Sequence, residues 1–130
     1  MLEMIRPILA ESGVVFAYLF GSRATEKNHN NSDFDLAIYL SEKDKRERFE
    51  SKLILMGKLT SILKKEVDIV VLNDIQNNFL LFDILQEGKI IFDQDEDLRF
   101  HFENTQRHQV IDFLTHLKYV NKERTNFAKN

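Results

Sequence analysis

The chain has 130 residues and a mass of 15.4 kDa, which suits one domain with a single hydrophobic core. Hydrophobic residues make up 43% of the sequence and charged residues 30%, so the composition is that of a folded globular domain and excludes a disordered chain. Cysteine is absent, which excludes a disulfide framework, a thiolate nucleophile, and zinc or iron–sulfur centres ligated by cysteine.

The charge balance excludes a strong general attraction to nucleic acids or to anionic membranes. The formal net charge is −3 and the pI is about 5.8. Residues 1 to 13 carry charges and a proline among their apolar side chains, and no stretch has the length and hydrophobicity of a transmembrane span. We therefore expect a cytoplasmic protein that does not bind nucleic acid directly.

The first predicted elements are a short helix and a buried strand. Residues 2 to 11 place apolar side chains on one helical face, and Gly13 is a typical helix end. Residues 14 to 20 (VVFAYLF) form a continuous apolar, β-branched and aromatic run, which predicts a strand buried on both faces. The polar stretch that follows this strand shows one short helical turn, at residues 22 to 26, before a loop.

The most regular strand is predicted over residues 33 to 40 (DFDLAIYL). Apolar and polar residues alternate there, as they do in a strand with one face against the core. One face carries Phe34, Leu36, Ile38 and Leu40, and the other carries Asp33, Asp35, Ala37 and Tyr39.

A long surface helix is predicted over residues 43 to 64, and Ser41 with Asp44 resembles a capping box at its start. Apolar residues recur at helical spacing through this Lys- and Glu-rich segment, which predicts one buried stripe on a solvated helix. The stripe consists of Phe49, Leu53, Met56, Leu59 and Leu63.

Three shorter elements follow the long helix. Residues 67 to 72 predict a third strand, in which Asp68 is the only charged residue. Residues 79 to 86 predict a short helix with Gly88 as its left-handed end, and residues 89 to 92 predict an edge strand.

A last helical pattern runs from residue 95 nearly to residue 123. We therefore divide the chain into a core, residues 1–95, and a C-terminal helical extension of the same domain, residues 96–130. The apolar stripe of this extension either packs on the core or docks a partner. His101 and His108 are two helical turns apart, too far for joint metal ligation, and are expected at the surface or at an interface.

Two strands carry aspartates that could share a cation. Asp33 and Asp35 are two residues apart in one strand, so their carboxylates point the same way about 6.5 to 7 Å apart. Asp68 is the natural third carboxylate. Without a cation, three such groups would repel each other and raise each other's pKa. The group predicts an oxygen-ligated site for two Mg²⁺ or Mn²⁺ ions, with further ligands from the phosphates of a nucleoside triphosphate.

Gly21 and Ser22 follow the first strand, where a helical turn begins. Backbone N–H groups and the Ser22 hydroxyl could face anionic oxygens there, and Gly21 would allow close approach. A Gly-Ser turn or an Asp-x-Asp pair alone is common in proteins of other functions. Their combination at this spacing has a random expectation on the order of one in a thousand.

The segment GSRATEKNHNNSDFDLAIYL resembles the signature of the polymerase-β-like nucleotidyltransferase superfamily, and specifically of its minimal members: Gly-Ser, ten residues, then Asp-x-Asp. The resemblance covers residues 1 to about 95. It implies an α/β fold with a small mixed sheet flanked by helices, here followed by a long C-terminal helix.

The resemblance also implies roles for individual residues. Asp33 and Asp35 would bind the metal ions, and Asp68 would complete the triad and help to deprotonate the acceptor hydroxyl. Gly21 with Ser22 would hold the triphosphate of ATP. Many members read Gly-Ser-Arg-Ala-Arg-Gly, whereas Thr25 and Glu26 stand at the last two places here, which leaves Arg23 as the nearer phosphate-binding cation.

Minimal nucleotidyltransferases are typically paired with a small helical HEPN ribonuclease, as antitoxin and toxin. The resemblance therefore implies a type VII-like antitoxin: a protein adenylyltransferase that moves AMP from ATP to a tyrosine of its HEPN partner and silences it. Two alternatives stay open: an inactive module that neutralises its partner by occlusion, and a small-molecule nucleotidyltransferase of the aminoglycoside type. The intact triad argues against the first, and the short chain leaves little room for the acceptor pocket that the second requires.

Overall fold

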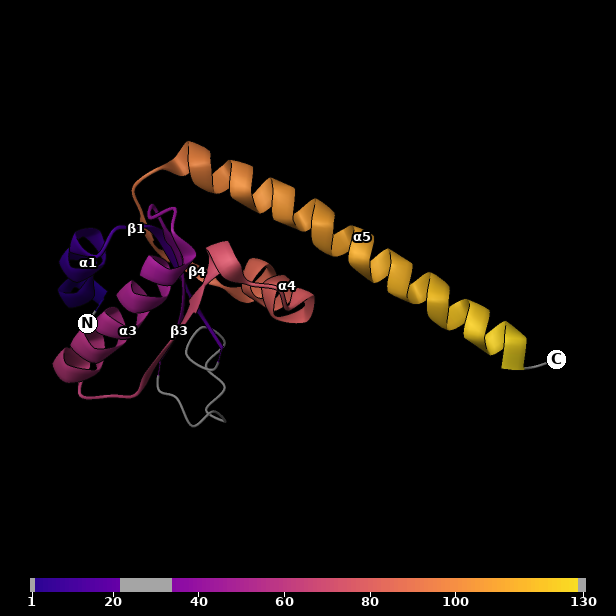
Figure 1. Cartoon of the computed structure of the whole chain (residues 1–130), viewed down its shortest axis with the longest axis horizontal. Coiled ribbons are helices and arrows are strands. Elements are labelled where there is room, and N and C mark those ends of the chain that lie inside the picture. The colour runs from indigo at the N-terminus through magenta and orange to yellow at the C-terminus, as the bar shows by residue number, and fades with distance from the viewer. Residues whose placement is uncertain (1, 22–33, 129–130) are drawn as a thin grey trace.

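The computed structural model describes the backbone of residues 2–21 and 34–128, and the side chains of these residues up to position 122. Within this part a four-stranded sheet lies between two layers of helices (Figure 1). The elements in chain order are α1 (Leu2–Glu11), β1 (Val14–Phe20), β2 (Phe34–Leu40), α3 (Lys45–Leu63), β3 (Val67–Val71), the 3-10 turn η1 (Leu72–Asp74), α4 (Asn78–Glu87), β4 (Lys89–Asp93) and α5 (Glu96–Ala128).

The sheet contains strands of both directions, in the order β3-β2-β1-β4. β1 pairs antiparallel with β2 and with β4, whereas β2 and β3 run parallel. The parallel pair requires a crossover, because the chain must return to the same end of the sheet, and α3 provides that crossover. The predicted fold class, a small mixed sheet flanked by helices with a long C-terminal helix, is confirmed.

One face of the sheet packs against α1 and α3. The alternation predicted for β2 is confirmed, because every second residue of that strand enters this layer of the core. The layer is built from Ile5 and Leu9 of α1, Phe34, Leu36, Ile38 and Leu40 of β2, Leu55 and Leu59 of α3, and Val67, Ile69 and Val71 of β3, with further residues of β1 and β4.

The stripe predicted for α3 is wrong at its N-terminal end. Phe49 and Leu53 are 56% and 51% exposed, whereas Leu55 and Leu59 are buried. The reason lies in an ion pair at the start of the helix: the Arg48 guanidinium donates to Asp74 of η1 at 2.6 Å, so Arg48 takes the inward position. Because the side of α3 that carries Arg48 faces the sheet, Phe49 and Leu53 face solvent.

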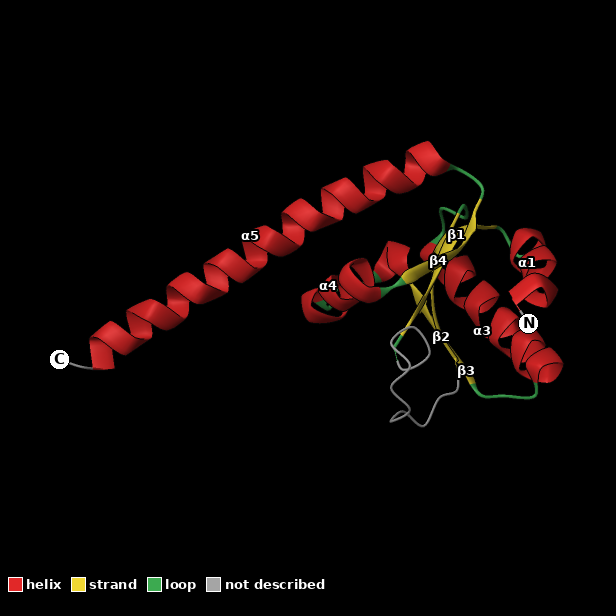
Figure 2. Cartoon of the chain, turned by 180° about the vertical axis from the view of Figure 1, so that it is seen from behind, coloured by secondary structure: helices red, strands yellow, loops and turns green. Residues whose placement is uncertain are grey.

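The other face of the sheet packs against α4 and α5 (Figure 2). Phe16 of β1 stacks on Tyr39 of β2 with ring centroids 4.8 Å apart, and Phe102 of α5 lies 5.5 Å from Phe16. Val110 is also buried in this layer, so the N-terminal part of α5 belongs to the core. Leu81 and Ile84 complete it from α4.

An ion-pair network joins α5 to the sheet. The Arg99 guanidinium contacts Asp93 of β4 at 2.6 Å and Glu103 at 2.5 Å, and Glu103 also accepts a 2.8 Å hydrogen bond from the Tyr18 hydroxyl of β1. Arg99 is only 8% exposed. Burial alone would lower the pKa of Arg99, but the hydrogen bonds from its guanidinium to Asp93 and Glu103 raise it above the usual value. The sequence patterns gave no sign of this network.

Two helix ends differ from the prediction. Asp44 is the N-cap of α3, and its side chain accepts from the backbone N–H groups of residues 46 and 47. The predicted capping box at Ser41 is therefore wrong; the Ser41 hydroxyl donates instead to the carbonyl of Gly13. Gly88 closes α4 in extended backbone, with φ −67° and ψ 144°, so the predicted left-handed end is also wrong. The helix end predicted at Gly13 is confirmed: α1 ends at Glu11, and Gly13 has left-handed backbone with φ +80°.

The C-terminal part of α5 projects beyond the sheet and α4 (Figures 1 and 2). The helix has 33 residues, which corresponds to a length of about 50 Å. Exposed apolar side chains of α5 include Ile111, which lies beside α4, and Tyr119, nearer the C-terminal end, at 58% and 59% exposure. Among the described residues, no helix combines the length and the apolar character needed to cross a membrane.

Candidate active site

Two of the predicted metal-binding aspartates lie side by side. Asp35 is the second residue of β2 and Asp68 the second residue of β3, and the two are register partners in the parallel pair. Adjacent strands are about 4.8 Å apart, and register partners point to the same side of the sheet. The structure therefore brings these two carboxylates, 33 residues apart in the sequence, to one end of the sheet.

The pair opens on the face covered by α4 and α5. Side chains along β2 point alternately to the two faces of the sheet. Asp35 lies on the same face as Ala37 and Tyr39, as predicted, and this face packs against α4 and α5. Asp35 is 7% exposed, whereas Asp68 is exposed on the edge strand β3. One carboxylate is thus held within the fold, and the other is accessible from solvent.

Gly21 lies against the Asp35 side chain. Phe20, the last residue of β1, is the register partner of Asp35, and Gly21 follows with a φ of +74°. A Cβ atom at position 21 would lie 2.5 Å from Oδ2 of Asp35. The structure thus places the glycine turn directly against the Asp35 carboxylate, a contact that the sequence motifs did not predict.

The remaining predicted site residues lie outside the described part of the chain. These are Asp33, Ser22 and Arg23, together with the helical turn predicted at residues 22 to 26. Among the described side chains, those of residues 2–21 and 34–122, no three metal-ligating groups gather at one point. Asp35 and Asp68 supply oxygen donors side by side, which fits a hard divalent cation that takes its other ligands from water and phosphate.

The histidines predicted to lie on the C-terminal helix do not contribute to this site. His101 and His108 are exposed on α5, as predicted, and neither belongs to a metal-binding group among the residues described.

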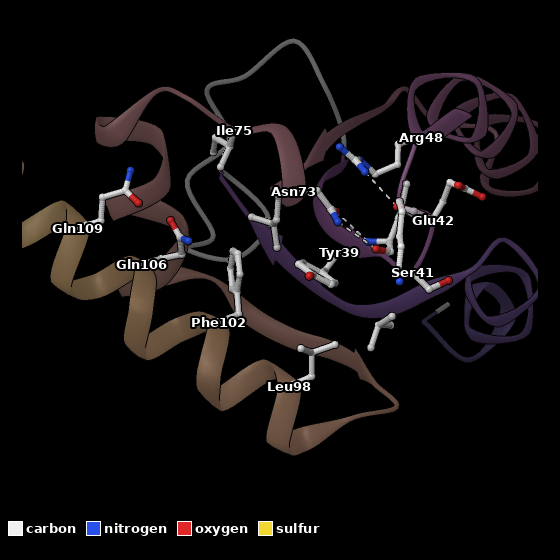
Figure 3. A pocket seen from close by; sticks show the side chains of 14 residues that line it. Tyr39, Ser41, Glu42, Arg48, Asn73, Ile75, Leu98, Phe102, Gln106 and Gln109 are labelled. Atoms are coloured by element: carbon white, nitrogen blue, oxygen red, sulfur yellow. Dashed lines mark hydrogen bonds between the residues drawn. The ribbon is translucent and has the colours of Figure 1, made fainter. Parts of the chain in front are cut away.

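A groove of about 730 Å³, which sequence reasoning missed, opens at the other end of β2 (Figure 3). The Tyr39 and Phe102 rings, 5.4 Å apart, line it together with side chains of α5 and of the segment around η1. Tyr39 is four residues beyond Asp35, which places this groove about 13 Å along the strand from the carboxylates. No motif marks these residues, because they meet only in the folded chain.

Polar contacts fix one wall of the groove. The Asn73 amide accepts from the backbone N–H of Leu40 and donates to its carbonyl. Arg48 binds Asp74 with two nitrogen atoms and the carbonyl of Glu42 with a third contact. The hydrogen bonds from Arg48 hold the pKa of Asp74 below its usual value, and those to Asp74 raise the pKa of Arg48.

Comparison with known proteins identifies a family. The family model described as "Polymerase beta, Nucleotidyltransferase" matches residues 3–97. A search of curated protein sequences gives no significant match.

Solved structures with the same fold come from toxin–antitoxin complexes. A mutant MntA–HpeT complex contains a chain with a TM-score of 0.69 and 21% identity, covering 100% of this chain and 99% of that one. A toxin–antitoxin structure with AMP-PNP contains a chain with a TM-score of 0.68 and 23% identity, covering 99% of this chain and 98% of that one. A structure of a tri-AMPylated HEPN toxin with MNT antitoxin from Shewanella oneidensis contains a chain with a TM-score of 0.61 and 19% identity, and the match covers 100% of both chains.

The family match includes all four strands and both described carboxylates, and the fold likeness extends over the whole chain. The resemblance inferred from the Gly-Ser and Asp-x-Asp motifs is confirmed. The chain belongs to the polymerase β nucleotidyltransferase family.

Proposed function

We propose that this chain is an antitoxin that transfers AMP from ATP to a tyrosine hydroxyl of a cognate HEPN ribonuclease toxin and thereby inactivates it. The observation that carries the proposal is the pairing of Asp35 with Asp68 beside Gly21, in a member of a nucleotidyltransferase family. A family member without enzymatic function would have no need of two neighbouring carboxylates, whose mutual repulsion costs stability.

Three structures of similar fold support the choice of nucleotide and partner. One holds AMP-PNP, an ATP analogue, and another holds a tri-AMPylated HEPN toxin with its MNT antitoxin. The mutant complex carries glutamate in place of two aspartates that are two residues apart. Asp33 and Asp35 have the same spacing here, which is why we assign them the same importance.

The proposed reaction is a substitution at the α-phosphorus of ATP. The acceptor oxygen forms the new bond, the bond to the β-phosphate oxygen breaks, and pyrophosphate leaves. Bound Mg²⁺ supplies positive charge for the attacking and leaving oxygens. Asp33, Asp35 and Asp68 hold the metal, and Asp68 also takes the acceptor's proton. Gly21, Ser22 and Arg23 hold the triphosphate.

A protein acceptor fits this fold better than a small molecule. The groove at Tyr39 is about 13 Å along β2 from Asp35, so a small acceptor bound there would not present its hydroxyl to the carboxylates. Asp68 lies exposed on an edge strand, where the side chain of a docked protein can reach it.

The test uses the purified chain, Mg²⁺, a HEPN-family protein encoded beside it, and each nucleoside triphosphate labelled on the α-phosphate. We expect label on the HEPN protein from ATP, recovered on tyrosine, and loss of ribonuclease activity in parallel. Removal of Mg²⁺ with a chelator should abolish labelling. Label recovered on added aminoglycosides instead would support the small-molecule alternative.

Matched variants separate chemistry from occlusion. Asp35→Asn and Asp68→Asn should each abolish labelling, whereas Asp83→Asn, a change at an exposed carboxylate of α4, should leave it intact. If the wild-type chain labels nothing but still silences the toxin, and both variants silence it equally well, the chain acts by occlusion and the proposal is wrong.

A further inference from the structure

The backbone at Gly21 passes unusually close to a carboxylate. A Cβ atom built on Gly21 would lie 2.5 Å from Oδ2 of Asp35, 3.3 Å from its Cγ and 3.4 Å from its Cβ. The Oδ2 atom therefore occupies the space that a Cβ atom at position 21 would need, and Cγ and Cβ of the same side chain lie close behind it. Asp35 is also 7% exposed, so its carboxylate lies within the fold beside the glycine and not in bulk solvent.

Gly13 provides an internal comparison at the other end of the same strand. Gly13 and Gly21 flank β1, and both have left-handed backbone, with φ of +80° and +74°. A Cβ at Gly13 would meet only the Ser41 hydroxyl, at an ordinary contact distance of 3.5 Å. The two positions share the same conformational demand, but only Gly21 faces a carboxylate.

We propose that Gly21 is a positioning residue for Asp35: the absence of a side chain at position 21 sets the orientation in which the Asp35 carboxylate meets the divalent cation. This inference rests on the proposed function for the metal-binding role of Asp35. It assigns Gly21 a task different from the close approach to phosphate that its motif predicts.

The sheet explains why the carboxylate, and not the strand, would give way. β2 is paired with β1 on one side and with β3 on the other, so its backbone is held by ladders on both edges. Rotation of the carboxylate away from an added methyl group is the smallest change that relieves the clash, because the carboxylate is the terminal group of its side chain. A Gly21→Ala chain should therefore fold, with the Asp35 oxygens displaced.

A double-mutant cycle tests the contact without any ligand. Gly21→Ala and Gly13→Ala are each made in the wild-type chain and in an Asp35→Ala chain, and Tm is measured for all. In the wild-type background, we expect Gly21→Ala to lower Tm more than Gly13→Ala does. In the Asp35→Ala background, we expect the two glycine substitutions to lower Tm by about the same amount. An equal loss from Gly21→Ala in both backgrounds would overturn the inference.

Metal binding tests the positioning role. Free Mn²⁺ is followed by electron paramagnetic resonance during titration of the wild-type, Gly13→Ala and Gly21→Ala chains. We expect Gly21→Ala to weaken Mn²⁺ binding about tenfold or more, in the range of losses seen when groups that orient ligands are changed, and Gly13→Ala to leave it unchanged. Unchanged Mn²⁺ affinity in Gly21→Ala, with weaker binding of ATP alone, would assign Gly21 to the phosphates and overturn the inference.

The two proposals fail in different ways. A wild-type chain that binds no Mn²⁺ and transfers no label overturns the proposed function, and with it the metal role of Asp35. If the wild-type chain binds Mn²⁺ and transfers label, and Gly21→Ala does both equally well, only the role of Gly21 is overturned.

Discussion

The hydroxyl of Tyr18, in the middle of the sheet, donates a 2.8 Å hydrogen bond to Glu103 of α5, 85 residues further along the chain. Glu103 is held in turn by Arg99, which also binds Asp93 at the end of β4. This contact ties the long helix to the strand that leads to Gly21. Its loss should therefore be felt in the stability of the whole fold.

Tyr18→Phe should lower the free energy of unfolding by about 1 to 2 kcal/mol, because a buried hydrogen bond to a charged acceptor is lost while the ring stays in place. Urea denaturation measures the change. Tyr39→Phe is the matched control, since the Tyr39 ring stacks on Phe16 and no hydrogen bond of its hydroxyl is recorded among the described residues. Equal losses in the two variants would show that the Tyr18 contact contributes nothing specific.

Alkaline pH should destabilise the fold through the same residue. Burial, together with the hydrogen bond to Glu103, raises the pKa of the Tyr18 hydroxyl above its usual value. A group with a raised folded-state pKa contributes stability that is complete below the unfolded pKa, about 10, and is lost as the pH rises above it. We expect the wild-type chain to lose more stability than Tyr18→Phe between about pH 9 and about pH 11. Parallel curves for the two chains would contradict this.

Phe102→Ala should destabilise the sheet as well as α5. Phe102 is 9% exposed and packs on Phe16, so its truncation should cost about 3 kcal/mol or more. Phe100→Ala removes a ring of the same size that is 52% exposed two residues earlier, and should cost much less. One shared unfolding transition would support our proposal that residues 96–130 belong to the same domain as residues 1–95. If α5 melts separately and Phe102→Ala leaves the main transition unchanged, that proposal is wrong.

Acid should weaken the fold through Asp74. The hydrogen bonds from Arg48 hold the pKa of Asp74 below its usual value, although burial partly opposes them. A depressed folded-state pKa contributes stability that is present above the unfolded pKa, about 3.9, and is lost as the pH falls through the folded value. Asp74→Asn should therefore reduce the loss of stability between about pH 5 and about pH 3. Asp83→Asn, at an exposed carboxylate of α4, should not reduce it.

Local patterns in the sequence predicted the strands well. The alternation of β2 has the period of a strand, and the β-branched and aromatic residues of β1, which end at a glycine, favour a strand over a buried helix. Asp68 stood out because it interrupts an apolar strand. Its pairing with Asp35 could be expected from the family but not from spacing, since register depends on how β2 and β3 align.

Long-range polar contacts account for what the sequence did not predict. Phe49 and Leu53 have helical spacing, but the ion pair of Arg48 with Asp74 turns α3 so that they face solvent. The network of Arg99 and Glu103 and the groove at Tyr39 likewise depend on residues that meet only after folding. Gly21 was predicted for its approach to phosphate, whereas its contact with Asp35 needed the three-dimensional structure.

The intact mass of the HEPN partner is the most direct test of the central claim. The partner is incubated with ATP, Mg²⁺ and the wild-type, Asp68→Asn or Asp83→Asn chain, and its mass is measured before and after. We predict a gain of one or more adenylyl groups with the wild type and Asp83→Asn, none with Asp68→Asn, and a folded Asp68→Asn chain at least as stable as the wild type because one repulsive carboxylate is gone. An unchanged partner mass with every chain, or an equal gain with Asp68→Asn, would contradict the account.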